Sequence, residues 1–232
     1  MKIKICGVTE IGILNFLIEN GVDYVGFIFH ENSPRNVTHA FINEIKNIDF
    51  QKTRPVCVFV NPEKSFVNSS LSYFENPIIQ FHGDESEDFC KLFDCEFWKA
   101  LRIKDSKSLE DMKHFKNAQA ILCDTFKEGI YGGTGSSFDW EILNTDLFLD
   151  RKIILSGGLS IENLENALKI NPWCLDFNSG VESAPGFKDH SKIMKILSLI
   201  EKLKITYQIK MDSSVNMEAS LFQKLLCMPS MN

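Results

Sequence analysis

The chain has 232 residues, of which 44% are hydrophobic and 24% are charged, and its formal net charge at pH 7 is −6. This length and composition allow one large core, so a single domain is the simplest expectation. The acidic balance argues against a broad basic face for nucleic acid, and no apolar run is long enough to span a membrane.

Cysteine usage indicates a reducing compartment. The seven cysteines are scattered, and the first residues do not form a signal peptide. We therefore expect a cytoplasmic protein without a disulfide framework, in which most cysteines fill the core. Cys90 and Cys95 have no second Cys or Cys/His pair nearby, so no structural zinc site is predicted.

Eight short runs of β-branched and other apolar residues alternate with segments of helical pattern. The runs are KIKIC, VDYVGFIF, RPVCVFV, NPIIQF, EFWKALRI, AQAILCD, KIILSGG and WCLDFNS. Each run and the segment after it have about the length of one strand-helix unit. Such units can form an open doubly wound sheet or a closed barrel. We favour the barrel, because the units are compact and no G-x-G-x-x-G follows the first run.

The predicted fold is therefore α/β, a single (β/α)8 TIM barrel over residues 1–204 with a short C-terminal extension over 205–232. The first helix is expected over Thr9–Asn20, with Gly21 as its stop. Residues that can cap a first turn mark the starts of three later helices. They are Thr38, Asn61 and Ser160. The clearest amphipathic helix in the chain follows Asp189.

Polar residues within the apolar runs fall mostly at one end, where the loops that carry chemistry in such a barrel gather. Cys6 ends the first run, and it is either a reactive thiol or a small core residue. Asp124 can act as an acid if burial raises its pKa, or it can cap a turn or pair with a cation. Arg35 can bind a carboxylate through two hydrogen bonds, or it can be a surface arginine. His82 can be a functional residue or a turn residue.

Two turns of small residues suggest a site for a phosphate group. Gly157 and Gly158 follow the seventh run, and Ser179 and Gly180 follow the eighth. Glycine lets backbone N–H groups approach an anion closely, and in this fold phosphate commonly binds between these two loops. The alternative is that both are simply tight turns. Residues 128–140, EGIYGGTGSSFDW, lack the pattern of a nucleotide-binding loop, and we interpret them as a lid over the site.

Taken together, several stretches resemble the phosphoribosylanthranilate isomerase family. They are KICGVT, GFIF followed by SPR, VFVN, QFHGDE, ILCDTF, YGGTGSSFDW, LSGGL and DFNSGVESAPGFKD. The resemblance runs from Lys2 to about Leu203 in the order of the family. It implies an aldose-ketose isomerase of tryptophan biosynthesis that rearranges N-(5-phosphoribosyl)anthranilate without a cofactor or metal.

The resemblance also implies roles for individual residues. Asp124 matches the acid that protonates the ring oxygen of the sugar, and Cys6 matches the base that removes the C2′ proton. Arg35 matches the residue that holds the anthranilate end, and His82 and Asp176 match positions that line the sugar site. The phosphate cradle corresponds to Gly157, Gly158, Ser179 and Gly180. For Cys6 to act as a base, we expect the site to lower its pKa or to polarise the thiol.

Two departures from the family concern the pocket wall: Asn36 replaces an aromatic residue, and Phe177-Asn178 replaces a smaller pair. Two other functions remain open. A related barrel isomerase acts on a histidine-pathway aminoaldose, but such enzymes usually have aspartate where Cys6 stands and bind two phosphates. The other is a catalytically inactive barrel that binds a phosphorylated metabolite or a protein.

The extension over 205–232 lies beyond the resemblance. Met217, Leu221 and Leu225 can line one face of a short helix. Such a helix folds against the barrel wall, forms a dimer contact, or is part of a disordered terminus. The expected partner is a small phosphorylated substrate, and the expected assembly is a monomer or homodimer.

Overall fold

The computed structural model describes residues 1–125, 139–143 and 151–203. The chain forms two compact units, Met1–Lys192 and Ile193–Asn232. Of the second unit, only the helical residues 193–203 are described. The expected extension over 205–232 lies outside the described residues, as does nearly all of the expected lid over 128–140.

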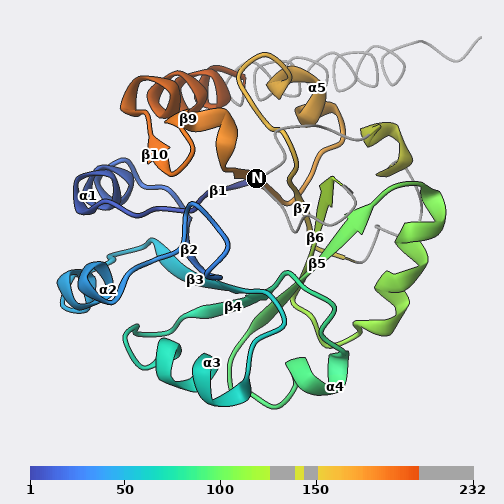
Figure 1. Cartoon of the computed structure of the whole chain (residues 1–232). Helices are drawn as coiled ribbons and strands as arrows, with labels where there is room; N and C mark the ends of the chain where they lie inside the picture. The colour runs from blue at the N-terminus through green and yellow to red at the C-terminus, as the bar shows by residue number, and fades with distance from the viewer. Residues whose placement is uncertain (126–138, 144–150, 204–232) are drawn as a thin grey trace, which may run out of the picture. The chain divides into compact units, whose positions relative to one another are not determined.

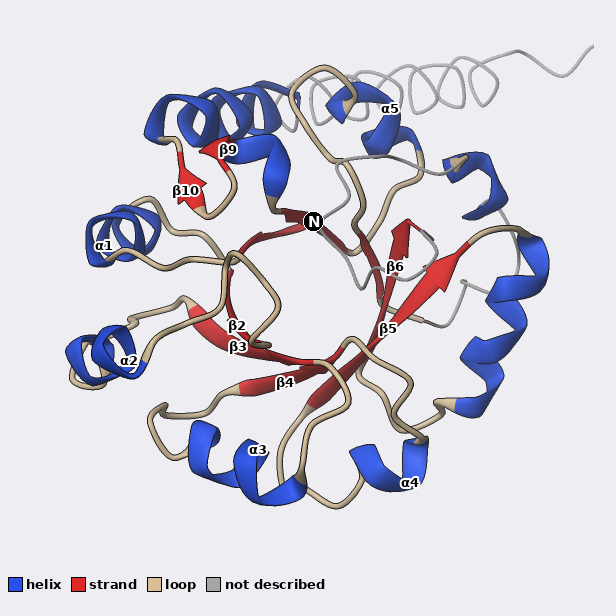
Figure 2. Ribbon diagram, in the orientation of Figure 1, coloured by secondary structure: helices blue, strands red, loops and turns tan. Residues whose placement is uncertain are grey.

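Eight parallel strands form a closed barrel in the first unit, in the order of the chain. They are β1 (Lys2–Cys6), β2 (Tyr24–Phe29), β3 (Arg54–Phe59), β4 (Ile78–Phe81), β5 (Phe97–Ile103), β6 (Ala120–Thr125), β7 (Ile153–Leu155) and β8 (Cys174–Phe177). The barrel closes where β1 pairs with β8. Figures 1 and 2 show the ring of strands with the helices around it. The prediction of a closed barrel is confirmed.

The connections between strands carry the helices. The α-helices are α1 (Ile11–Glu19), α2 (His39–Ile45), α3 (Lys64–Leu71), α4 (Glu87–Cys90) and α5 (Leu164–Lys169), and residues 190–203 are also helical. Three described segments are 3₁₀ helices, namely Ser106–His114, Trp140–Leu143 and Ser179–Val181. A short hairpin of β9 (Glu182–Ala184) and β10 (Phe187–Lys188) follows the last of them.

Several helix signals in the sequence are confirmed. Gly21 has a φ of 65° and ends α1, and its N–H donates to the carbonyl of Ile18. The Thr38 side chain accepts a hydrogen bond from the N–H of Phe41 and so caps α2. The helix after Asp189 begins as expected, with the Asp189 carboxylate accepting from the N–H of Lys192.

Two predicted helix starts are wrong. Asn61 does not cap α3, whose first residue is Lys64. Its side chain instead accepts from the N–H of Asp84 in the loop after β4, so a tertiary contact replaces the expected local one. Ser160 does not begin a helix either, because its own N–H donates to Asn163 and α5 starts only at Leu164.

The barrel interior is filled by residues of even number from all eight strands. This cluster consists of Cys6, Tyr24, Val56, Val58, Ile78, Trp98, Ala100, Ala120, Leu122, Ile154 and Cys174. Neighbouring strands pair even with even and odd with odd positions, so one parity faces inward throughout. The other parity faces the helices, where Phe29 and Phe59 stack with ring centroids 5.2 Å apart.

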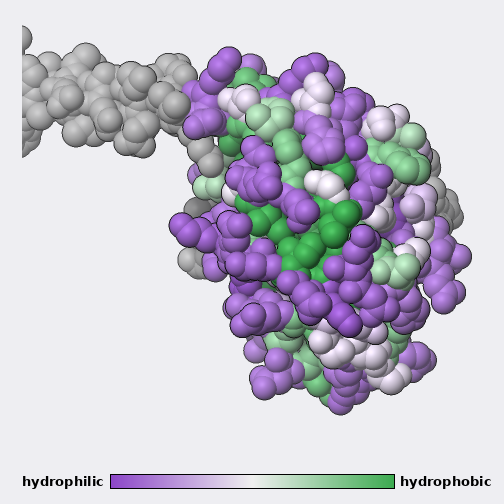
Figure 3. Space-filling model, turned by 90° about the vertical axis from the view of Figure 1, so that its left-hand side faces the viewer, coloured by the Kyte–Doolittle hydropathy of each residue, from purple (hydrophilic) through white to green (hydrophobic). Residues whose placement is uncertain are grey.

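The surface next to α1 and α2 is mainly hydrophilic, as Figure 3 shows, with hydrophobic residues gathered near its middle. Ile13, Leu14, Leu17 and Ile18 of α1 turn away from solvent and so do not add to this hydrophobic surface. This is the expected arrangement for an amphipathic helix on a barrel wall.

The pairing of Gly26 with Cys6 generates a prediction about stability. A Cβ atom at Gly26 would lie 2.6 Å from Cys6 Sγ and 3.0 Å from its Cα. We expect Gly26→Ala to lower the free energy of unfolding by about 1–3 kcal/mol, because the close-packed interior has no room for a methyl group.

Urea denaturation measures this change, with Gly12→Ala in α1 as the matched control. Nothing lies within 4 Å of a Cβ at Gly12, so the control is expected to raise the free energy of unfolding by about 0.5–1 kcal/mol. Equal effects of the two substitutions would contradict the interpretation.

Candidate active site

The side chains predicted to form the site lie at the C-terminal ends of the strands. Cys6 ends β1, Asp124 is near the end of β6, Asp176 lies in β8, and His82 directly follows β4. Because these positions are all even, their side chains have the same inward direction as the interior cluster. Four side chains that are far apart in the sequence therefore meet at one end of the barrel.

Cys6 is almost completely buried beside two charged groups. Burial raises the pKa of its thiol, while the positive charge of Lys4 lowers it and the negative charge of Asp176 raises it. Burial dominates, so the free thiol has a higher pKa than an ordinary cysteine. The barrel interior thus disfavours the charged thiolate, and the positive charge of Lys4 acts in the opposite direction.

Lys4 and Asp176 form an ion pair inside the barrel, with Nζ 2.8 Å from Oδ2. Both side chains are buried, and the two residues are directly paired between β1 and β8. The second carboxylate oxygen of Asp176, Oδ1, is buried without a hydrogen-bond partner among the described residues. Buried polar atoms are rarely left unpaired in native proteins, so this oxygen is suited to accept a hydrogen bond from a ligand.

Asp124 belongs to a second polar group, together with His82 and Gln80. Its Oδ2 lies 3.1 Å from Nε2 of His82, and its Oδ1 accepts from the N–H of Thr125. Nδ1 of His82 lies 2.9 Å from the amide nitrogen of Gln80. If Gln80 donates there, Nδ1 is the acceptor and the proton of a neutral imidazole lies on Nε2, facing Asp124.

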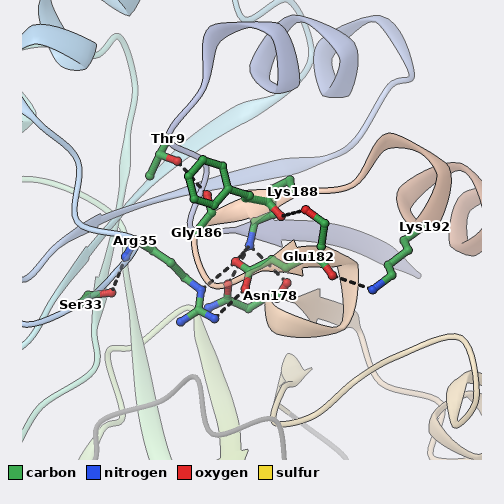
Figure 4. A network of polar contacts seen from close by, with 10 residues as sticks. Thr9, Ser33, Arg35, Asn178, Glu182, Gly186, Lys188 and Lys192 are labelled. Atoms are coloured by element: carbon green, nitrogen blue, oxygen red, sulfur yellow. Dashed lines mark hydrogen bonds and ion pairs between the residues drawn. The ribbon is translucent and has the colours of Figure 1, made fainter.

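Arg35 is held by a carboxylate of the same chain. Its Nε and Nη2 donate to the two oxygens of Glu182 at 2.8 and 2.7 Å, and the pair is buried. Figure 4 shows this pair together with Lys188, whose Nζ donates to Glu182 and to Asn178. The Arg35 side chain also lies over Gly7, next to Cys6. Arg35 is therefore a positioned residue rather than a surface one, and Nη1 is not part of its ion pair.

The two predicted phosphate loops lie against each other. A Cβ at Gly180 would collide with the carbonyl oxygen of Leu159, which follows Gly158. Gly157 and Gly158 both have positive φ, 83° and 66°, which only glycine adopts easily. Ser179 begins a 3₁₀ turn beside them. These glycines allow a close approach of backbone N–H groups, as an anion site requires.

The two sequence departures have structural roles. Oδ1 of Asn36 accepts from the N–H of His30 and closes the loop after β2. Oδ1 of Asn178 accepts from Lys188, so this residue belongs to the Arg35 network. In the described ranges, no three His, Cys, Asp or Glu side chains are placed to hold a metal ion. No helix among those residues is long and apolar enough to cross a membrane.

Comparison with known families matches residues 3–199 to one described as N-(5'phosphoribosyl)anthranilate (PRA) isomerase. The match includes residues of every strand of the barrel. The chain belongs to this family.

Individual relatives agree with this assignment. The chain is 39% identical over 204 residues to an N-(5'-phosphoribosyl)anthranilate isomerase of a Sulfurihydrogenibium species, covering 87% of this chain and 99% of the relative. Among solved structures, monomers generated from the dimeric isomerase of Thermotoga maritima match with a TM-score of 0.73 and 32% identity, covering 85% of this chain and 96% of that one.

A further isomerase structure contains a ligand. It is a complex with reduced 1-(o-carboxyphenylamino)-1-deoxyribulose 5-phosphate, and it matches with a TM-score of 0.73 and 31% identity over 85% of this chain and 96% of the other.

Sequence reasoning missed the groups that support the family's motif residues. Lys4, Glu182 and Lys188 were not predicted as site residues, although all three are buried and charged. Lys4 stands in KICG and Glu182 and Lys188 stand in SGVESAPGFKD, so the motifs contain them. The signal that could have found Lys4 is its inward-facing position on a strand. Lysine is rarely buried without a partner, so such a position indicates a buried ion pair.

Glu182 generates a prediction about acid stability. Burial alone would raise its pKa, but the Arg35 hydrogen bonds and the charge of Lys188 lower it below the ordinary glutamate value. A lowered folded-state pKa means that the carboxylate stabilises the fold above about pH 4.3, and that this stabilisation is lost as the pH falls through the folded-state value. Glu182→Gln removes the titrating group, so its unfolding free energy should fall less steeply in this acid range than that of the wild type.

Urea unfolding at a series of pH values on both sides of about 4.3 measures the slope. Glu19→Gln, at the exposed end of α1, is the control and should keep the wild-type slope. A wild-type slope in Glu182→Gln would show that Glu182 has no linkage to folding.

Proposed function

We propose that the chain is a phosphoribosylanthranilate isomerase. It converts N-(5-phosphoribosyl)anthranilate to 1-(2-carboxyphenylamino)-1-deoxyribulose 5-phosphate by an Amadori rearrangement in tryptophan biosynthesis. The observation that carries the proposal is the family match over residues 3–199, in a chain whose acid and base candidates, Asp124 and Cys6, face the same end of the barrel.

Asp124 supplies the proton that opens the sugar. The acid protonates the furanose ring oxygen, the C1′–O bond breaks, and the nitrogen lone pair forms a Schiff base at C1′. The contact between Asp124 and His82 supports this role, because the imidazole fixes the direction of the carboxyl group.

Cys6 removes the proton from C2′ of the Schiff base. The electron pair of that C–H bond moves toward nitrogen and gives an enolamine, which tautomerises to the ketone. The thiolate is the form that accepts a proton, so the burial that raises the thiol pKa must be offset when the substrate is bound. The reaction moves hydrogen within one molecule, and it therefore requires no external oxidant or cofactor.

Three groups hold the substrate in this proposal. The loops with Gly157, Gly158, Ser179 and Gly180 bind the phosphate, and Arg35 faces the anthranilate carboxylate through the nitrogen that Glu182 leaves unused. Oδ1 of Asp176 accepts from a ribose hydroxyl, which would give this buried oxygen its missing partner. The phosphate and the carboxylate are thus bound by different loops.

The enzyme is proposed to act in the cytoplasm as a monomer or homodimer on a small phosphorylated substrate. The described cysteines are all free, which suits a reducing compartment. A dimeric relative supports a homodimer as one of the two forms.

Substitution of the acid and of the base tests the assignment. Cys6→Ser and Asp124→Asn should each reduce kcat by about 10²–10⁴-fold, because each removes one proton-transfer group. Loss of substrate fluorescence on addition of phosphoribosylanthranilate measures turnover, and binding of a reduced product analogue should remain. Cys95→Ser and Asp88→Asn, outside the site, should keep wild-type turnover. Full activity in Cys6→Ser or Asp124→Asn would overturn the role of that residue.

Arg35→Lys tests the anthranilate contact separately. Lysine keeps the charge but cannot bind Glu182 through two parallel hydrogen bonds or present the remaining nitrogen in a fixed direction. We expect KM to rise by about tenfold or more while kcat changes less. Steady-state kinetics measure both, with Arg151→Lys as the control, since among the described residues Arg151 donates to backbone carbonyls between Phe115 and Ala118. An unchanged KM would remove Arg35 from the substrate site.

A further inference from the structure

Lys4 is a fully buried lysine in the interior of the barrel, two residues before Cys6 on the same strand. We propose that Lys4 is the positioning residue that makes Cys6 usable as a base, by serving as the counter-charge of its thiolate. This inference rests on the proposed function, in which Cys6 accepts a proton. It assigns a task to a residue that touches no reacting atom itself.

Alternation along β1 puts Lys4 and Cys6 on one face of the strand. Residues two apart on a strand point the same way, and Cys6 belongs to the interior cluster. The Lys4 ammonium is anchored by Asp176 at 2.8 Å, so it cannot swing away to solvent. Its positive charge lowers the pKa of the Cys6 thiol and so favours the thiolate. In a buried environment, a fixed ammonium stabilises a nearby thiolate more than it would in water.

Lys4 remains protonated while Cys6 acts as the base. Burial alone would lower its pKa, but the charges of Asp176 and Cys6 raise it above the ordinary lysine value. A permanently charged ammonium cannot accept the C2′ proton and is not a nucleophile. The proton therefore goes to the Cys6 sulfur, and the task of Lys4 is electrostatic.

Asp176 opposes Lys4 in its effect on Cys6. Its negative charge disfavours a thiolate, whereas the Lys4 ammonium favours one. A ligand hydroxyl that donates to the unpaired Oδ1 of Asp176 would draw its negative charge away from Lys4. Substrate binding would then leave more of the ammonium's charge to the sulfur, which links binding to activation of the base.

Other charged groups also face Cys6, from several elements. Lys188 of β10 lowers the thiol pKa, and its own charge is shared with Glu182. Arg35 lies over Gly7 but is neutralised by the same glutamate. The negative charge of Asp124 raises the pKa of Asp176, and Asp124 is not among the main influences on the pKa of Cys6. Among these groups, Lys4 has the strongest effect in favour of the thiolate.

Alkylation of Cys6 by iodoacetamide tests the inference without substrate. At a fixed, mildly alkaline pH the rate follows the thiolate fraction, and peptide mass spectrometry separates Cys6 from the other cysteines. Lys4→Met should slow alkylation of Cys6 by about tenfold or more, and Asp176→Asn should accelerate it by about tenfold. Cys95, half-buried and distant in sequence, serves as the internal reference.

The opposite signs separate an electrostatic role from a structural one. A substitution that merely loosens the barrel exposes the thiol and accelerates alkylation in both variants. Acceleration or no change in Lys4→Met would therefore overturn the proposal. Lys2→Met, on the same strand with an exposed ion pair to Asp23, is the matched control and should leave the Cys6 rate unchanged.

Lys4→Met leaves a buried carboxylate unpaired, which can prevent folding. The double variant Lys4→Met/Asp176→Asn removes both charges and keeps the side-chain shapes similar. The double variant differs from Asp176→Asn only in lacking the Lys4 ammonium, so alkylation of Cys6 should be slower in the double variant than in Asp176→Asn. A rate equal to or above that of Asp176→Asn would contradict the proposal.

Wild-type turnover of phosphoribosylanthranilate tests the proposed function independently. If the wild type is inactive but the alkylation rates move in opposite directions, the role of Lys4 stands and the substrate assignment fails. If turnover is normal and Lys4→Met does not slow alkylation, the function stands and the role of Lys4 fails.

Discussion

The ion pair between Lys4 and Asp176 is the interaction on which the site depends. It joins the first strand to the last at the seam where the barrel closes, and both charges are buried. Burying two charges is costly, and the cost is offset only if each keeps its partner in good geometry. The pair therefore fixes the relative position of β1 and β8, and with it the positions of Cys6 and of the unpaired Asp176 oxygen.

The proposed acid and the proposed base have different charged neighbours. Lys4 and Lys188 are cations that act on Cys6, whereas Asp124 lies against the imidazole of His82. The reaction needs one group that donates a proton and a second group that accepts a proton at the same pH. Different surroundings of the two groups make this possible. The buried glutamate between Arg35 and Lys188 keeps two cations in place without leaving their charges uncompensated.

Much of the fold could be predicted, because its signals are local. The alternation of apolar runs and helical segments indicated the units, and Thr38 and Gly21 act within one turn of their own helices. The start of α3 could not be predicted, because Asn61 binds the loop after β4 instead of its own helix. A capping residue has the same local pattern whether or not a tertiary partner competes for it.

The sequence by itself determined the family, the eight strand-helix units and the identity of Cys6, Asp124 and Arg35 as site candidates, because these follow from short motifs in a fixed order. Only the tertiary structure decided what surrounds them. The partner of Lys4 is 172 residues away and that of Arg35 is 147 residues away, and no local pattern pairs them. Closure of the barrel brings Lys4 and Asp176 together in a buried interior, and burial there raises the pKa of the Cys6 thiol.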